Sequence, residues 1–268
     1  MKIFRFSSGD WNGCPVDAWL HTSVTSEMKQ RLHPAVVILP GGGYGFLSER
    51  EAEPVAERYF SAGFNTFIVR YSVKEQAKDF LPLVQLTSTI ALIRENSEEW
   101  FTDREKIAVC GFSAGGHLAC SAGTLFNEPE FLRVALVKTN TRPDAMILCY
   151  PVITADEYAH VGSIENVSGA TKGSARYTWF GLDAHVDEQT PPAFIWHTAE
   201  DRTVPVENSL KFSAALSKNH IPFELHIFPE GKHGLSVCTD QVNTKNEYAG
   251  RWVDMSIRWL NKTFGFQY

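Results

Sequence analysis

The sequence has 268 residues, of which 44% are hydrophobic and 21% are charged, and its formal net charge at pH 7 is −6. This composition provides a large core and excludes wholesale disorder. The basic residues form no stripe that would contact nucleic-acid phosphates, so nucleic-acid binding is not expected. The length fits a single domain spanning residues 1–268.

No apolar run reaches the roughly 18 residues of a transmembrane helix, and the first seven residues lack the apolar run of a signal peptide. The cysteines are odd in number, and none forms the Cys-x-x-Cys pair of a zinc or redox site. They are Cys14, Cys110, Cys120, Cys149 and Cys238. We therefore predict reduced thiols, no metal site, no membrane association and a cytoplasmic location.

Short apolar, β-branched runs alternate with helical patterns along the chain. Ile3–Phe6 and Val16–Val24 are expected to add antiparallel strands at one edge of a sheet. The elements expected after them are, in chain order, a strand at Ala35–Leu39, a helix at Glu49–Ala62, a strand at Phe64–Tyr71, a helix at Leu83–Glu99, a strand at Ile107–Phe112, a helix at Gly115–Phe126, strands at Ala145–Tyr150 and Ala193–His197, a helix at Val206–Asn219, a strand at Phe223–Phe228 and a helix near Asn243–Phe264. This alternation predicts an α/β fold with a mostly parallel central sheet covered by helices on both faces.

Two segments carry further local expectations. Ser48 and Glu51 have the spacing of a capping box, which would begin the first long helix. Residues 151–192 show no clean strand or helix but many glycines, polar residues and aromatics. Because long loops in compact domains are usually functional or disordered, we predict that this stretch is a lid or insertion. The alternative is a surface excursion with one or two short helices.

The sharpest local signal lies at residues 111–116, which read Gly-Phe-Ser-Ala-Gly-Gly. They follow a strand-like run and precede a helix-like run, which is the context of a nucleophile elbow. Glycines at the flanking positions let the chain reverse from strand to helix without side-chain clashes. The turn would leave the Ser113 hydroxyl at a helix N-terminus, where the Ala114 N–H can stabilise an oxyanion.

A glycine loop is the candidate for the second oxyanion donor. Residues 40–45 read Pro-Gly-Gly-Gly-Tyr-Gly and follow the first parallel strand. Successive glycines let backbone N–H groups approach a substrate oxygen, so Gly42 and Gly43 are the predicted donors. The alternatives are a flexible turn or a nucleotide-binding loop, but neither Gly-x-Gly-x-x-Gly nor Gly-Lys-Ser/Thr follows.

The acid and the base are expected later in the chain, in the order serine, acid, histidine. Asp201 follows a late strand. It is preferred over Glu200 because Asp-x-x-Val-Pro resembles the pattern that carries the acid in proteins with a nucleophile elbow. A helix cap is the alternative role for Asp201. His233 lies in a glycine-flanked loop after the last strand and is the predicted base.

Three other histidines are less suited to the role of base. His226 lies inside a strand-like run, where a side chain is more readily packed than catalytic. His220 lies at a helix end, where a cation suits the dipole. His117 follows Ser113 by four residues and is interpreted as structural, packed within its helix against the sheet or a neighbour.

With these residues placed, the sequence resembles the small carbohydrate-esterase-like α/β hydrolases of gut and lactic-acid bacteria, which include acetylxylan-esterase-like and feruloyl-esterase-like enzymes. The Ser-x-Arg-Glu-Ala-Glu-Pro run is the narrowest match. A departure is Pro40, which stands where the hormone-sensitive-lipase branch has histidine before its glycines. The matching segments are Val37–Tyr44, Leu47–Ala56, Gly111–Leu118, Thr190–Phe194 and Gly231–Gly234.

The resemblance implies hydrolysis of short acyl esters, including acetyl groups on sugars, without metal or organic cofactor. Tyr44, Trp179 and Phe180 are the predicted substrate contacts, and the last two could instead anchor the presumed lid to the core. The expected partner is a small-molecule ester, and a homo-oligomer is compatible with the composition. An amidase of the arylformamidase type and a catalytically silent ligand-binding protein are the alternative functions.

Overall fold

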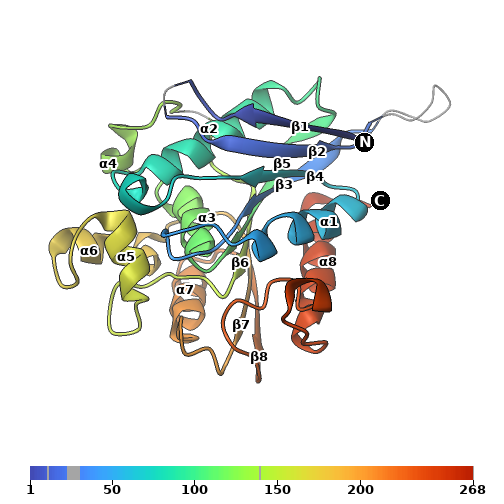
Figure 1. The fold of residues 1–268 in the computed structure, drawn as a ribbon. Coiled ribbons are helices and arrows are strands. Elements are labelled where there is room, and N and C mark those ends of the chain that lie inside the picture. Colours follow the sequence, from blue (N-terminus) through green and yellow to red (C-terminus); the bar gives the residue numbers. More distant parts are fainter. Residues whose placement is uncertain (11, 23–30, 139, 268) are drawn as a thin grey trace.

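The computed structural model of the protein describes residues 1–10, 12–22, 31–138 and 140–267. In this part of the chain eight strands form one sheet in the order β1-β2-β4-β3-β5-β6-β7-β8 (Figure 1). β2 pairs antiparallel with β1 and β4, and every other pair is parallel. The predicted mostly parallel sheet with antiparallel strands at one edge is confirmed. The strands are β1 Lys2–Ser7, β2 Pro15–Leu20, β3 His33–Leu39, β4 Asn65–Val69, β5 Thr102–Phe112, β6 Ala145–Cys149, β7 Ala193–Thr198 and β8 Phe223–Phe228.

Helices cover both faces of the sheet, as predicted (Figure 1). Successive side chains of β3 point to opposite faces, so Val37 joins one apolar core and Val36 the other. The first core includes side chains of α2, α3 and α7, and the second includes side chains of α1 and α8. These helices are α1 Glu53–Ser61, α2 Leu81–Glu95, α3 Ala114–Thr124, α7 Glu207–Lys218 and α8 Trp252–Phe264.

The predicted helix Glu49–Ala62 is wrong in its first turn. A 3₁₀ turn, η1 Glu49–Glu51, is separated from α1 by a break at Ala52, whose ψ is −103°. The capping box is also absent, because the Ser48 side chain makes no capping hydrogen bond. The Glu51 carboxylate binds other groups, described below.

Other boundaries differ where local backbone geometry ends a helix. α2 ends at Glu95 rather than Glu99. The last helix begins at Trp252, after η4 Asp240–Val242 and η5 Ala249–Arg251, because Asn243 has a positive φ of 54° that a helix cannot continue. The end of the predicted strand Val16–Val24 lies outside the described residues.

Residues 151–192 contain more regular structure than the sequence indicated. They form α5 Val161–Ser168, α6 Ala175–Trp179 and η3 Leu182–His185. The expectation that this stretch has no clean helix is therefore wrong, whereas its role as a lid or insertion stays a prediction. These helices are too short to show a clear period, and the side chains of His160 and Ser174 cap α5 and α6.

Two shorter helical turns, η2 Lys74–Ala77 and α4 Pro129–Leu132, complete the elements of the described residues. No helix in the described ranges combines the length and apolarity that crossing a membrane requires. The five cysteines are all free and buried.

The parallel strands bring the predicted site residues to one edge of the sheet. The glycine loop follows β3, Ser113 follows β5, Asp201 follows β7 and His233 follows β8. Because parallel strands end at the same edge, loops that are distant in the sequence meet there. This edge is where open α/β sheets bind their ligands.

Candidate active site

Ser113 lies at a sharp turn between β5 and α3. Its φ of 54° and ψ of −117° place a non-glycine residue in a strained conformation. The flanking glycines allow the turn: a Cβ at Gly111 would lie 2.1 Å from the Gly115 carbonyl oxygen, and one at Gly115 would lie 2.1 Å from the Leu39 carbonyl oxygen. The turn packs the start of α3 against β3 and leaves the Ser113 hydroxyl at the helix N-terminus.

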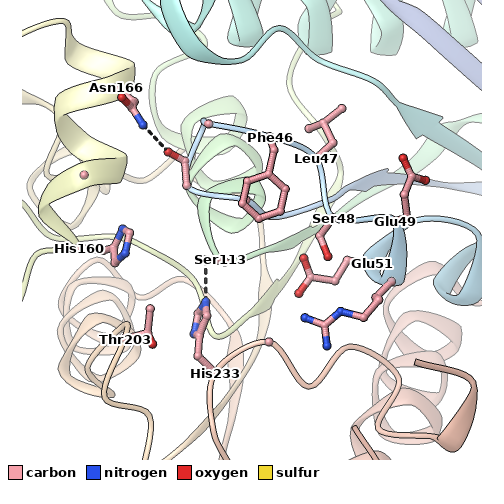
Figure 2. Close-up of a pocket in the computed structure, with 16 residues that line it drawn as sticks. Phe46, Leu47, Ser48, Glu49, Glu51, Ser113, His160, Asn166, Thr203 and His233 are labelled. Carbon is pink, nitrogen blue, oxygen red and sulfur yellow. Dashed lines mark hydrogen bonds between the residues drawn. The ribbon is translucent and has the colours of Figure 1, made fainter. Parts of the chain in front are cut away.

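A chain of hydrogen bonds joins Ser113, His233 and Asp201. The Nε2 atom of His233 lies 2.8 Å from Ser113 Oγ, and its Nδ1 atom lies 2.6 Å from Asp201 Oδ2. Because a carboxylate only accepts, Nδ1 carries the proton and Nε2 accepts from the serine hydroxyl. Figure 2 shows the His233 ring pointing toward Ser113. The structure thus brings together the three residues that the sequence assigned to nucleophile, base and acid.

Four donors surround the Asp201 carboxylate, whose side chain is fully buried. Besides His233, the N–H groups of Thr203 and Val204 donate to Oδ1 at 2.9 and 3.0 Å. His197 Nε2 lies 3.3 Å from Oδ2. Burial alone would raise the pKa of the Asp201 carboxyl, but the hydrogen bonds from His197 and His233 outweigh it and hold that pKa well below its usual range. Asp201 is therefore ionised at neutral pH.

His197 is a site residue that the sequence analysis missed. It lies in β7, is fully buried, and accepts from Ser209 at Nδ1, 2.8 Å away. Its Nε2 faces the Val204 carbonyl at 2.9 Å as well as Asp201, so Nε2 carries the proton. The signal available in the sequence was a histidine at the end of a strand, four residues before the predicted acid.

Gly42 and Gly43 of the glycine loop line the same pocket as Ser113. Gly42 and Gly43 have φ values of 130° and 65°, which glycine adopts without strain. No acceptor within the described ranges binds the N–H of Gly42, Gly43 or Ala114. The Asn166 amide donates to the Gly43 carbonyl at 2.8 Å and ties the loop to α5 (Figure 2). These three N–H groups are free to hold an oxyanion.

Glu51 is a second residue whose position the sequence did not predict. Its carboxylate is buried and accepts from the Gly41 N–H at 2.8 Å and from the Tyr150 hydroxyl at 2.6 Å. These contacts replace the predicted capping bond. The Ser48 N–H instead donates to the Gly41 carbonyl at 3.0 Å. Gly41 is thus hydrogen-bonded at both backbone groups, so its N–H is not available to a substrate oxygen.

A pocket of about 650 Å³ opens above Ser113. Figure 2 shows Phe46, His160, Thr203 and Asn166 around the opening. Phe46 keeps 62% of its surface exposed although it lines this pocket. Residues on η1 and the His233 loop complete the wall. The full lining is Gly42, Gly43, Gly45, Phe46, Leu47, Ser48, Glu49, Arg50, Glu51, Ser113, His160, Gly162, Asn166, Thr203, His233 and Gly234.

The predicted substrate contacts Tyr44, Trp179 and Phe180 do not belong to the described lining of this pocket. Tyr44 is fully buried, and Phe180 is 1% exposed. Trp179 packs edge-on against Phe80 and Phe180. The aromatic pair therefore anchors the 151–192 segment to the core, which is the alternative role considered from the sequence.

The side chains of three alternative residues for acid and base bind groups other than the Ser113 hydroxyl. His117 is buried, accepts from the Tyr44 hydroxyl at Nδ1 and donates from Nε2 to the Phe180 carbonyl, each at 3.0 Å. This geometry fits its structural interpretation. His226 lies in β8 and binds the Glu224 side chain at 2.7 Å. Glu200 accepts from the Gly231 N–H at 3.3 Å.

Comparison with solved structures gives close matches over almost the whole chain. The acetyl ester-xyloside bifunctional hydrolase from Caldicellulosiruptor lactoaceticus matches with a TM-score of 0.81 and 35% identity, covering 96% of this chain and 90% of that one. The carboxylesterase Cest-2923 from Lactobacillus plantarum matches with a TM-score of 0.88 and 27% identity, covering 98% of each chain. An alpha/beta hydrolase from a deep-sea metagenome library has a TM-score of 0.79 and 35% identity, covering 99% of each chain. The predicted α/β-hydrolase fold is confirmed.

Curated relatives are longer than this chain. Endo-1,4-beta-xylanase B of Butyrivibrio fibrisolvens is 36% identical over 209 residues, which cover 77% of this chain and 33% of that protein. Acetylxylan esterase of Xylanibacter ruminicola is 30% identical over 214 residues, which cover 76% of this chain and 42% of that protein. The matched region is thus less than half of each relative. The family model described as BD-FAE matches residues 23–216, and the chain therefore belongs to the BD-FAE family.

Proposed function

We propose that the protein is a serine carboxylesterase that hydrolyses short-chain acyl esters, with acetyl esters of sugars as the natural substrate class. The observation that carries the proposal is the hydrogen-bonded chain from Ser113 through His233 to the buried Asp201 carboxylate. It lies at an open pocket and beside three N–H groups without acceptors in the described part of the chain. This arrangement supplies nucleophile, base, orienting acid and oxyanion donors together.

The geometry supports an acyl-enzyme mechanism. Ser113 Oγ attacks the ester carbonyl carbon while its proton moves to His233 Nε2, and the carbonyl electrons move onto oxygen. The N–H groups of Ala114, Gly42 and Gly43 hold this oxyanion. The imidazolium, stabilised by Asp201, then protonates the leaving alcohol as the ester bond breaks. Water repeats the sequence on the acyl-enzyme and releases the acid.

The pocket and the comparisons support an acylated sugar as substrate. Phe46 offers an exposed ring face, while His160, Thr203 and Asn166 add polar groups around the same opening. A sugar ring has both apolar C–H faces and hydroxyl groups, so this combination suits it. The printed names acetylxylan esterase and acetyl ester-xyloside bifunctional hydrolase, carried by two similar proteins, point to the same substrate class.

Two further expectations belong to the proposal. Residues 151–192 supply His160, Gly162 and Asn166 to the pocket wall, which supports their role as a lid that widens or narrows the opening. The free, buried cysteines support a cytoplasmic location, where thiols stay reduced.

The test is hydrolysis of p-nitrophenyl acetate, butyrate and octanoate by the wild type and by Ser113→Ala. We expect the wild type to prefer the shorter esters and the variant to lose at least about a thousandfold in kcat, because the nucleophile is absent. Equal rates for both proteins, or no hydrolysis by a folded wild type, would overturn the esterase assignment. Acetylated xylo-oligosaccharides, assayed for released acetate, then test the substrate class.

A further inference from the structure

A buried bridge of hydrogen bonds joins the glycine loop to the loop that carries His233. At one end Glu51 Oε2 accepts from the Gly41 N–H at 2.8 Å. In the middle Glu51 Oε1 accepts from the Tyr150 hydroxyl at 2.6 Å. At the other end the Tyr150 oxygen accepts from the Ser236 N–H at 2.9 Å. Three segments from distant parts of the sequence are thereby fixed to one another.

The direction of each bond in the bridge is determined. Burial, reinforced by the nearby Glu51 carboxylate, raises the pKa of the Tyr150 hydroxyl well above 10. The hydroxyl therefore keeps its proton, and it donates this proton to Glu51. Its oxygen is then left to accept from the Ser236 backbone. A second contact strengthens the same junction, because the Ser236 hydroxyl donates to the Arg50 carbonyl.

Both ends of the bridge touch the catalytic groups. A Cβ placed on Gly41 would lie 3.0 Å from Ser113 Cβ, so Gly41 packs directly against the nucleophile, and the next residue is a predicted oxyanion donor. At the other end the Tyr150 ring meets the His233 imidazole edge-on, with centroids 5.0 Å apart. The bridge thus extends from the glycine loop to the predicted base. Tyr150 itself is not among the residues that line the pocket.

A carboxylate in this place is costly for stability. Glu51 is 3% exposed, and none of the salt bridges among the described residues involves it. A buried charge without a counter-ion destabilises a fold unless hydrogen bonds satisfy it. Both of its oxygens are used on groups that hold the active site. We interpret the loss of stability as offset by the accurate placement of the catalytic groups, because misplacement by about 1 Å can reduce a rate by about a hundredfold.

We propose that Glu51 and Tyr150 form a positioning pair that sets the distance between the oxyanion donors and the His233 imidazole. The inference rests on the proposed function, since it assigns a role within the same site. Neither residue exchanges a proton with substrate. Each acts through a backbone loop: Glu51 through Gly41 and Tyr150 through Ser236 and the face of His233.

The first test compares Tyr150→Phe with a matched control. Tyr150→Phe keeps the ring against His233 and removes only the hydroxyl. Tyr59→Phe removes a hydroxyl that is also buried and hydrogen-bonded, at 2.8 Å to Ser256, but Tyr59 is not among the residues that line the pocket. With active sites counted by fluorophosphonate titration, we expect kcat for p-nitrophenyl acetate to fall about tenfold or more in Tyr150→Phe, with KM little changed. Tyr59→Phe should retain the wild-type kcat.

The second test is a double-mutant cycle with Glu51→Gln, which keeps the size of the side chain and removes its charge. Each substitution interrupts the same bridge of hydrogen bonds. The double variant should therefore be as active as the less active of the two single variants. The affinity for a boronic acid, which mimics the oxyanion, should fall by the same factor as kcat/KM. A structural role alone would lower the fraction of titratable sites and leave these per-site values unchanged.

The outcomes separate this inference from the esterase assignment. An active wild type with unchanged per-site kcat in both single variants, or with multiplicative losses in the double variant, would overturn the positioning pair and leave the esterase intact. A folded wild type that neither hydrolyses ester nor reacts with the fluorophosphonate would overturn both.

Discussion

Asp201 accepts hydrogen bonds at both carboxylate oxygens, and this fixes what a substitution there would do. Two backbone N–H groups bind Oδ1, while His197 and His233 approach Oδ2. Every contact is with a hydrogen-bond donor, so both side-chain atoms at the end of residue 201 must be acceptors. An amide would place an NH₂ group against at least one of these donors.

Asp201→Asn is therefore expected to disturb the proton position on His233 while keeping the size of the side chain. We expect kcat/KM for p-nitrophenyl acetate to fall by about 10³–10⁴-fold, because the imidazole loses its correct tautomer. Asp254→Asn, at an exposed position of α8, is the control and should match the wild type. Activity of Asp201→Asn equal to this control would exclude Asp201 as the orienting acid.

Phe46 is expected to select for a ring on the alcohol side of the ester. Replacing it with alanine removes the exposed ring face, so the KM for acetylated xylobiose should rise about 2–10-fold, in line with the strength of one aromatic contact. Ethyl acetate, which has no ring, should be hydrolysed as before. Phe223→Ala, at the opposite end of the sheet, is the matched control. Equal effects on both esters would assign Phe46 to general packing.

The residues that could be predicted are those whose chemistry is local in the sequence. Ser113 and His233 lie in glycine-marked turns, and Asp201 follows a strand, so the pattern alone indicated three side chains that the structure brings into contact. Glu51 was misassigned because its partner Tyr150 lies 99 residues away. Trp179 was assigned to the pocket because an aromatic side chain does not reveal which surface it contacts.

At the scale of elements, the close approach of α3 to β3 sets the nucleophile turn. Gly115→Ala would place a Cβ 2.1 Å from the Leu39 carbonyl oxygen and 2.5 Å from that of Pro40, both backbone atoms that cannot rotate away. We expect the free energy of unfolding to fall by about 1–3 kcal/mol or more in urea titration. Gly162→Ala in α5 meets nothing within 4 Å and should change stability by less than about 1 kcal/mol. Equal stability of the two variants would contradict the packing argument.

The elements themselves were predictable to different extents. The inner parallel strands β3, β6 and β7 are buried on both faces, and their continuous apolar runs placed each within two residues of its observed bounds. The break at Ala52 was not predictable, since the contacts of Glu51 with Gly41 and Tyr150 override local helix preference there. The short helices of residues 151–192 depend on tertiary packing, such as Ile164 and Tyr177 in the core.

At the scale of the whole molecule, buried histidine makes stability depend on pH. Burial lowers the pKa of His117 from its ordinary 6.5 to about 4. The unfolded chain therefore binds this proton near pH 6.5, and the folded chain binds it only near pH 4. The contribution to stability is complete above pH 6.5 and is lost as the pH falls toward 4.

His117→Gln should remove this part of the acid sensitivity. Between pH 7 and pH 5 the wild type should lose about 2 kcal/mol more unfolding free energy than the variant. Urea unfolding at the two pH values measures this difference. A His117→Gln variant with wild-type pH dependence would refute the assignment of His117 as a neutral buried group.

The central claim is that Ser113 is the nucleophile of this fold, activated through His233. Mass spectrometry of the protein after treatment with a fluorophosphonate tests it most directly, because the reagent reacts fastest with a serine hydroxyl that a neighbouring base activates. We predict one adduct on the wild type, located on the peptide that contains Ser113, and none on Ser113→Ala or on unfolded wild type. An adduct on a different residue, or an unmodified folded wild type, would contradict the account.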